Sequence, residues 1–268
     1  MKFNEVLYWC EFPLRADWKK INSLFVSNGM KAKCYICVES EEEFRDWKNK
    51  LRHLRGIEVA GAWPSIPLEK GYWFSGFVDK KEIDKLEQYK WLKLKIDIEP
   101  PFKYFKMLSV VNAMTWVMLH PFRPAKTKAY LQEKIESVLK NNEVMLSTFP
   151  LPDFVLRRYG FFRNSRFHYN FMFYSSIMPW FFRPLYRIYY RWFIRHALRR
   201  SKQTYFAVGL ISKGIFNSEP QYKNVSQIRK DMGFLLKNKV KNVVVYSIEG
   251  ISRRKDSEEW VKAIKEFI

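Results

Sequence analysis

Segments that read as β-strands alternate with segments that read as helices along the chain, and this alternation limits the fold more than any other feature of the sequence. Parallel strands need crossover connections, which helices commonly supply, so we predict a parallel sheet covered by helices. The eight expected strands lie at residues 4–12, 30–39, 57–63, 92–99, 143–148, 167–174, 204–211 and 240–247. Eight strands favour a closed α/β barrel of the (β/α)8 TIM type. An open doubly wound sheet is the alternative, although no glycine-rich phosphate loop follows the first strand.

Helical spacing predicts helices between these strands, and capping signals mark some of their ends. Ser40 and Glu43 form a capping box, and Asn28-Gly29 is a stop signal. The expected helices lie at residues 16–28, 41–54, 79–89, 102–120, 126–141 and 257–268. Because nothing in the composition divides the 268 residues, we predict one domain, 1–268, with helical elaborations at about 102–142 and 153–202.

The net charge of the chain is strongly positive, which bears on its partners. The sequence has 48 Lys and Arg against 27 Asp and Glu, a net charge of +21. So much like charge repels itself, which favours an anionic partner such as nucleic acid, a phospholipid surface or an acidic polymer. A lysine-rich surface of the kind found in heat-adapted proteins is the alternative. With 47% hydrophobic and 18% aromatic residues, a disordered chain is excluded.

Cysteine and histidine usage indicates neither a metal centre nor a cofactor. Cys10, Cys34 and Cys37 are too few for a disulfide framework, and the CxxC of the last two falls on a strand, where residues three apart face opposite sides. The four histidines lack metal-ligand spacing. The first residues contain acids where a secretion signal has an apolar core, and the uncharged segments are too short for a membrane span. We expect a cytoplasmic location and leave open peripheral contact with the inner membrane face.

The segment LKLKIDIEPP, residues 92–101, is the candidate centre of the molecule. As a strand with period two, it directs Lys93, Lys95, Asp97 and Glu99 to one face and its Leu and Ile residues to the other. Two prolines then end the strand. Charges on a central strand cost stability unless they are paired or face a solvated cavity, so we expect a site at its carboxyl end. A half-exposed strand with a solvated charged face is the alternative.

The site of a (β/α)8 barrel lies where its strands end, so its candidates can be collected from the sequence. Carboxylates and aromatic residues predominate at these positions. The substrate-binding candidates are Glu11, Trp63, Trp73, Lys95 and Tyr246. Carboxylates that crowd in a cleft raise one another's pKa, which keeps one acid protonated near neutrality. Flat tryptophan faces suit the stacking of sugar rings, so we expect a glycosidic substrate.

Two short motifs resemble those of a known family. KIDIE, residues 95–99, resembles the Asp-x-Asp-x-Glu signature of chitinase-like glycoside hydrolases, which are (β/α)8 barrels. MFY, residues 172–174, is similar to the Met-x-Tyr of that family's sixth strand. The resemblance implies that Glu99 is the general acid and that Asp97 orients the substrate's acetamido group or stabilises the intermediate. It also implies that Tyr174 donates a hydrogen bond there.

The sequence departs from the family pattern at two positions. Lys95 stands where the family has its first Asp, and Ser175 follows Tyr174 where the family has Asp or Asn. Pairing of Lys95 with Asp97 would lower the pKa of Asp97 and keep it charged. Loss of the family's chemistry is the other interpretation of the lysine.

A second hypothesis pairs Glu99 with Glu249, at the end of the eighth strand, as acid and nucleophile. Structural carboxylates that pair with the abundant Lys and Arg are the alternative. The sequence shows no GxSxG elbow and no Ser-His-Asp arrangement. The catalytic candidates are Glu99, Asp97, Tyr174 and Glu249.

The segment between Asp153 and Lys202 is basic and aromatic. It carries eleven Lys or Arg against a single acid, and 17 aromatic residues lie between Phe154 and Phe193. Arginine beside Trp, Tyr and Phe is typical of an interfacial helix among anionic lipid headgroups. The membrane-binding candidates are Arg183, Arg187, Arg191, Trp192, Arg195 and Arg199. A buried aromatic core and a nucleic-acid surface are the alternatives.

These patterns favour a glycoside-hydrolase-like enzyme that acts on a glycan or glycolipid at an anionic membrane surface by carboxylate acid–base chemistry. The alternative is a non-catalytic barrel that binds anionic lipid, glycan or nucleic acid through its basic aromatic surface. Acid–base chemistry of this kind requires carboxyl groups about 5 to 9 Å apart, a spacing that only the folded chain supplies.

Overall fold

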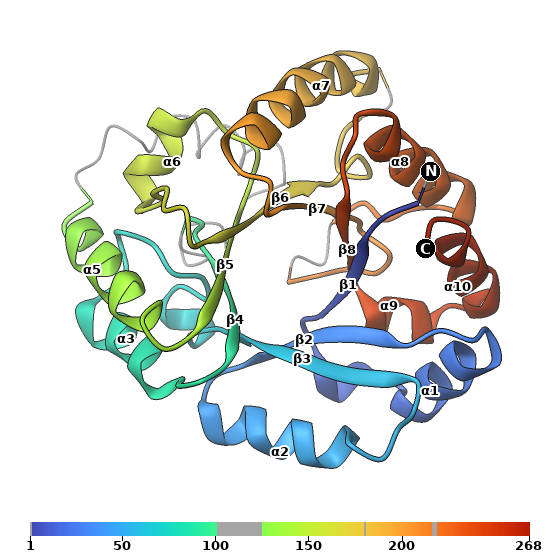
Figure 1. The fold of residues 1–268 in the computed structure, drawn as a ribbon, viewed down its shortest axis with the longest axis horizontal. Coiled ribbons are helices and arrows are strands. Elements are labelled where there is room, and N and C mark those ends of the chain that lie inside the picture. The colour runs from blue at the N-terminus through green and yellow to red at the C-terminus, as the bar shows by residue number, and fades with distance from the viewer. Residues whose placement is uncertain (1, 101–124, 180, 216–218) are drawn as a thin grey trace.

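A computed structural model describes residues 2–100, 125–179, 181–215 and 219–268 of the chain. These residues form a closed barrel of parallel strands in sequence order, with helices around it (Figure 1). The strands are β1 Glu5–Cys10, β2 Ala32–Val38, β3 Ile57–Pro64, β4 Lys93–Asp97, β5 Glu143–Thr148, β6 His168–Phe173, β7 Thr204–Val208 and β8 Asn242–Tyr246. The pairing of β1 with β8 closes the sheet, which confirms the (β/α)8 barrel and excludes the open doubly wound sheet.

Helices connect the strands on the outside of the barrel. They are α1 Trp18–Ser27, α2 Glu41–Leu51, α3 Lys80–Asp84, α5 Lys128–Val138, α6 Asp153–Tyr159, α7 Arg183–Arg200, α8 Val225–Lys237, α9 Ile248–Arg253 and α10 Ser257–Lys265. Short 3-10 helices lie at η1 Pro13–Arg15, η2 Leu68–Lys70 and η3 Lys85–Gln88. The predicted capping signal is present in α2, where Ser40 Oγ accepts from the backbone N–H of Glu43 at 3.1 Å.

The helix predictions were less complete than the strand predictions. The helix expected at 79–89 divides into α3 and η3, and the helix expected at 102–120 lies outside the described residues. We did not predict α8, although its buried residues Ile228, Met232 and Leu235 recur at the spacing of an amphipathic helix. Its signal was therefore present in the sequence.

Successive side chains of each strand point alternately into the barrel and outward to the helices, so they belong to two separate cores. Leu94 and Ile96 of β4 face outward and belong to the core between sheet and helices, whereas Lys95 and Asp97 face the barrel interior. Large side chains fill that interior. Gly61 on β3 leaves the space taken by the ring of Tyr35, since a Cβ there would lie 2.4 Å from the ring.

Polar pairs close the amino-terminal end of the barrel. Lys93 Nζ lies 2.9 Å from Glu143 Oε2, and Lys33 Nζ lies 3.1 Å from Glu5 Oε1. The hydroxyl of Tyr205 donates to Glu5 at 2.6 Å. Of the four charged residues predicted for one face of β4, Lys93 is thus part of this end, and the other three point to the opposite end.

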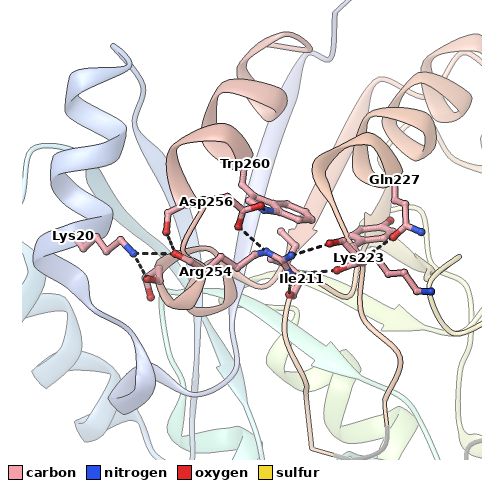
Figure 2. A network of polar contacts seen from close by, with 10 residues as sticks. Lys20, Ile211, Lys223, Gln227, Arg254, Asp256 and Trp260 are labelled. Atoms are coloured by element: carbon pink, nitrogen blue, oxygen red, sulfur yellow. Dashed lines mark hydrogen bonds and ion pairs between the residues drawn. The ribbon is translucent and has the colours of Figure 1, made fainter.

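Figure 2 shows a polar network that anchors the loop between β7 and α8. Arg254, which follows α9, donates from Nη1 to the carbonyl oxygens of Ile211 at 3.3 Å and Tyr222 at 3.2 Å. Its Nη2 donates to Lys223 O at 3.2 Å. On the other side, Lys20 of α1 donates to the carbonyl oxygen of Arg254 at 3.1 Å. One guanidinium therefore holds both ends of this loop.

The two ends of the sequence meet beside β1 and α10 (Figure 1), where the N–H of Phe3 donates to the carbonyl oxygen of Phe267 at 2.8 Å. Within the part of the chain that the structure describes, no helix is both long enough and apolar enough to cross a bilayer.

Candidate active site

A cavity of about 460 Å³ lies at the carboxyl ends of the strands, where a (β/α)8 barrel carries its site. One part of its lining is ionisable: Lys95 and the four acids that we call the acidic group, Glu11, Asp97, Glu99 and Glu219. Another part, the apolar wall, consists of Leu151, Ile177, Met178, Tyr186 and Tyr189, from α7 and the connections after β5 and β6. Trp9, Trp63, Trp73, Tyr174 and Tyr246 add aromatic surface.

Lys95 and Asp97 form a buried ion pair at the base of the cavity. Lys95 Nζ lies 2.7 Å from Asp97 Oδ2, and also 3.8 Å and 3.0 Å from the ring centroids of Trp9 and Trp63. Burial lowers the pKa of Lys95 and raises that of Asp97, and their mutual attraction opposes both shifts. The ion pair was predicted correctly, but the predicted lowering of the Asp97 pKa was wrong, because burial outweighs the attraction of Lys95. Trp63, predicted to bind substrate, therefore also stacks on the lysine.

Glu99 follows β4 and presents a carboxyl group with an open acceptor. Its Oε1 has no hydrogen-bond partner among the described residues. Burial raises the pKa of Glu99 well above its ordinary value, and the charge of Asp97 adds to this, while Lys95 opposes it. The backbone N–H of Glu99 donates to Phe74 O at 3.1 Å, which holds the loop that carries Trp73 against the end of β4. Glu99 is thus a buried acid with a raised pKa that lines the cavity.

Glu11 is a second buried acid, at the end of β1. The hydroxyl of Tyr72 donates to its Oε1 at 3.0 Å, and the hydroxyl of Tyr246 donates to its Oε2. Burial raises the pKa of Glu11 to about 8, with the charges of Glu219 and Glu249 adding to the rise and the tyrosine hydrogen bonds opposing it. The loop after β3 and the end of β8 therefore both reach the carboxyl group that follows β1.

Glu219 was not among the residues that we predicted. Its Oε2 accepts from the backbone N–H of Gly214 at 2.6 Å. A Cβ on Gly214 would lie 2.7 Å from that oxygen and 3.2 Å from Glu11 Oε2, so the two carboxylates approach the same point. The sequence does hold a signal, because Glu219 is the sole acid between Asp153 and Asp231.

The two remaining catalytic candidates have different positions. Tyr174 lines the cavity, with its ring centroid 5.7 Å from that of Tyr246. Glu249 lies in the first turn of α9, and its Oε1 accepts from the backbone N–H groups of Glu11 at 3.2 Å and Phe12 at 3.4 Å. It is not among the described residues that line the cavity. The structure therefore groups Asp97, Glu99 and Tyr174 and leaves Glu249 behind Glu11.

In the described ranges, no three His, Cys, Asp or Glu side chains lie close enough together to hold a metal ion. Cys10, Cys34 and Cys37 are buried and free. They pack within the cores, as expected for small hydrophobic side chains.

Helix α7 carries the arginines predicted to bind a membrane, Arg183, Arg187, Arg191, Arg195 and Arg199, which we call the basic ridge. The two sides of the helix differ. Tyr190, Phe193, Ile194 and Ala197 are buried, so the aromatic-core interpretation holds for the inner side. Arg191, Trp192, Arg195 and Arg199 are exposed, and Arg183 is half-buried. Arg187 differs from the ridge, because its Nη2 lies 3.3 Å from the buried Asp231.

Comparison with solved structures finds this fold in glycoside hydrolases. The PgaB (BpsB) glycoside hydrolase domain from Bordetella bronchiseptica superposes with a TM-score of 0.58 at 11% identity, covering 98% of this chain and 99% of that one. An endocellulase from Pyrococcus horikoshii, in complex with cellotetraose, gives a TM-score of 0.53 at 11% identity, covering 99% and 93%. The sequence matches no protein-family model and no curated protein. The resemblance to barrel glycoside hydrolases is therefore confirmed for the fold.

Proposed function

We propose that this protein is a glycoside-hydrolase-like enzyme and that Glu99 is its general acid. The observation that carries the proposal is the Glu99 carboxyl group, which is buried in a cavity at the barrel mouth and has one oxygen without a partner among the described residues. Burial and the charge of Asp97 raise its pKa, which favours the protonated form. A neutral acid in such a cavity can protonate the oxygen of a leaving group.

Asp97 is the proposed partner of Glu99. Lys95 binds its Oδ2, and Oδ1 has no partner in the described ranges. Burial raises the pKa of Asp97, and the ammonium group of Lys95 opposes that rise. In the proposal, Asp97 is the charged member of the pair and Glu99 is the protonated one. The charged Asp97 would orient the substrate or stabilise the positive charge that develops on the sugar. Lys95 is in this scheme a positioning residue.

The aromatic lining supports a saccharide as the substrate. Trp73, Tyr174 and Tyr246 line the same cavity as the acidic group. Rings of this kind pack on the apolar faces of sugars, while the carboxyl groups bind hydroxyls. The solved glycoside hydrolases with this fold add support of the same kind.

An anionic membrane surface is the proposed place of action. The exposed side of α7 combines the guanidinium groups of Arg191, Arg195 and Arg199 with the apolar side chains of Leu185 and Ile188. Arginine suits lipid phosphates, and the apolar residues suit the boundary between headgroups and acyl chains.

Glu99→Gln tests the catalytic assignment. On any glycan that the protein hydrolyses, we expect kcat to fall by about 10²–10⁴-fold, the usual contribution of a general acid. Glu249→Gln is the matched control, because its amide oxygen still accepts the two backbone hydrogen bonds, and it should keep most of the activity. Full activity of Glu99→Gln would remove the assignment.

Vesicle binding tests the membrane assignment. Replacement of Arg191, Arg195 and Arg199 by Glu should abolish co-sedimentation with phosphatidylglycerol vesicles. The control replaces three exposed lysines outside α7, Lys48, Lys237 and Lys241, with the same change of charge. Equal loss of binding in both variants would show that net charge, and not α7, binds the vesicles.

The Lys95–Asp97 pair favours a second candidate function, a non-catalytic barrel that binds anionic lipid, glycan or nucleic acid. A lysine that neutralises the central carboxylate removes charge from the cavity. This function requires binding without turnover and equal affinity of the wild type and Glu99→Gln. Nucleic acid as the partner would show as a steep fall of affinity with added salt and no response to lipid.

A further inference from the structure

The cavity joins two surfaces of different chemistry. Its base holds the acidic group, whereas the apolar wall offers no charged side chain. A free glycan is polar around its edges and would leave this wall without a partner, at a cost for every apolar surface that stays wet. Among the described residues, this wall therefore fits a substrate with an apolar part better than a free glycan.

The apolar wall continues onto the outside of the molecule along α7. Tyr189 lines the cavity, and its ring centroid lies 5.9 Å from that of Trp192, which is 56% exposed. Leu185 and Ile188 are 63% and 65% exposed. The spacing of 185, 188 and 192 places these three side chains in one stripe beside Tyr189. An apolar path thus leads from the cavity to the outer side of α7.

Helix α7 lies on the outside of the barrel (Figure 1), and three polar contacts tie it to neighbouring segments. The hydroxyl of Tyr189 donates to Pro150 O at 2.5 Å, and that of Tyr190 donates to Met172 O at the end of β6. Arg187 pairs with Asp231 of α8 at 3.3 Å. These contacts place the α7 part of the wall and the stripe next to each other on one helix.

We propose that the cavity takes an amphiphilic substrate, a saccharide joined to an alkyl chain. The sugar lies on the acidic group, and the chain leaves along the apolar wall toward the stripe on α7. The assignment of the sugar depends on the proposed function, whereas the assignment of the alkyl chain depends on the apolar wall and the stripe. The neighbouring Arg191 and Arg195 face the same outer side and match the anionic headgroups around such a substrate in a membrane.

Alkyl glycosides of different chain length test this inference. We would titrate the protein by calorimetry with methyl and decyl glucosides, maltosides and N-acetylglucosaminides, below the micelle concentration of each decyl compound. Each buried methylene strengthens binding about fourfold, so the decyl compound of at least one sugar should bind more than a hundredfold tighter than its methyl partner. Equal affinities, or no binding of any decyl compound, would overturn the proposal.

Two variants locate the chain. Ile177→Asn with Met178→Gln makes the apolar wall polar at two partly exposed positions, and should weaken decyl binding at least tenfold while methyl binding is unchanged. Val26→Asn with Trp91→Gln changes two exposed apolar residues outside the wall and should leave both affinities unchanged. Equal decyl affinity in both double variants would place the chain elsewhere and overturn the proposal.

Failure of the lipid part and failure of the catalytic part give different results. Suppose that the wild type hydrolyses none of the glycosides and that the decyl compound still binds more tightly than the methyl compound in both the wild type and Glu99→Gln. This result would uphold the amphiphilic ligand and remove the proposed function. Hydrolysis of a free oligosaccharide and of its alkyl-linked form with equal kcat/KM would uphold the proposed function and remove the amphiphilic substrate.

Discussion

Lys95 Nζ lies 2.7 Å from Asp97 Oδ2, and the two side chains have 0% and 2% of their surface exposed. The two residues stand two apart on β4, so both face the barrel interior. A buried pair of this kind adds little net stability, yet removal of one member leaves an uncompensated charge. The cost in stability of replacing Lys95 therefore depends on whether Asp97 is present, and the cost of replacing Asp97 depends on Lys95.

Lys95→Met should lower the free energy of unfolding by about 3–5 kcal/mol, because it leaves Asp97 buried without its partner. Asp97→Leu should cost a similar amount for the same reason. The double variant should be more stable than either single variant, since no buried charge remains from the pair. Chemical denaturation of the three proteins measures this, and additive losses would contradict the coupling.

Glu11 should make stability depend on pH. Its pKa of about 8 in the folded protein, against an ordinary 4.5, means that the folded state holds a proton that the unfolded chain releases. This contribution is fully present below pH 4.5 and is lost as pH rises to about 8. At about 1.4 kcal/mol per pKa unit, it amounts to a few kcal/mol.

Glu11→Gln should therefore flatten the fall of stability between pH 4.5 and 8, measured as the free energy of unfolding in denaturant at several pH values. Glu58→Gln, at a position whose side chain is 43% exposed, is the control and should keep the wild-type slope. An unchanged slope in Glu11→Gln would show that the carboxyl group of Glu11 is not protonated in the folded state.

Gly214→Ala should disturb the acidic group. The new Cβ would lie 2.5 Å from the hydroxyl of Tyr246 and 2.7 Å from Glu219 Oε2, so the carboxylate must move. We expect a loss of about 1–3 kcal/mol in stability, as in other overpacked sites. Gly233→Ala, on α8 with nothing within 4 Å, should instead stabilise by up to about 1 kcal/mol. Thermal unfolding of both variants compares the signs.

Arg254→Lys should loosen the loop that carries Glu219. A lysine has no fork of donors to reach the three carbonyl groups that Arg254 binds, and each hydrogen bond to a charged group contributes about 1.5–3 kcal/mol. Amide hydrogen exchange should become faster at residues 209–215 and 219–224. Arg229→Lys, at an exposed ion pair with Glu266, is the control and should change little. Unchanged exchange in Arg254→Lys would mean that other contacts anchor the loop.

Local patterns in the sequence were sufficient for the strands and for the facing of β4. Alternation of apolar and ionisable residues is a property of neighbouring positions, so this period alone assigns Lys95, Asp97 and Glu99 to one face of the strand. The predicted strands ran one or two residues beyond some observed ends, such as Cys10 and Tyr246, because local composition does not mark the last ladder hydrogen bond.

What the sequence by itself determined is therefore the alternation of strands and helices, the charged face of β4 and the basic ridge of α7. Closure of the barrel decided the rest. It brings the backbone of Glu11 to 3.2 Å from Glu249, which is 238 residues away in the sequence, and sets Glu219 beside Glu11. It also separates Arg187 from its ridge by pairing it with Asp231. Such contacts depend on which elements pack together in space, and no local period encodes them.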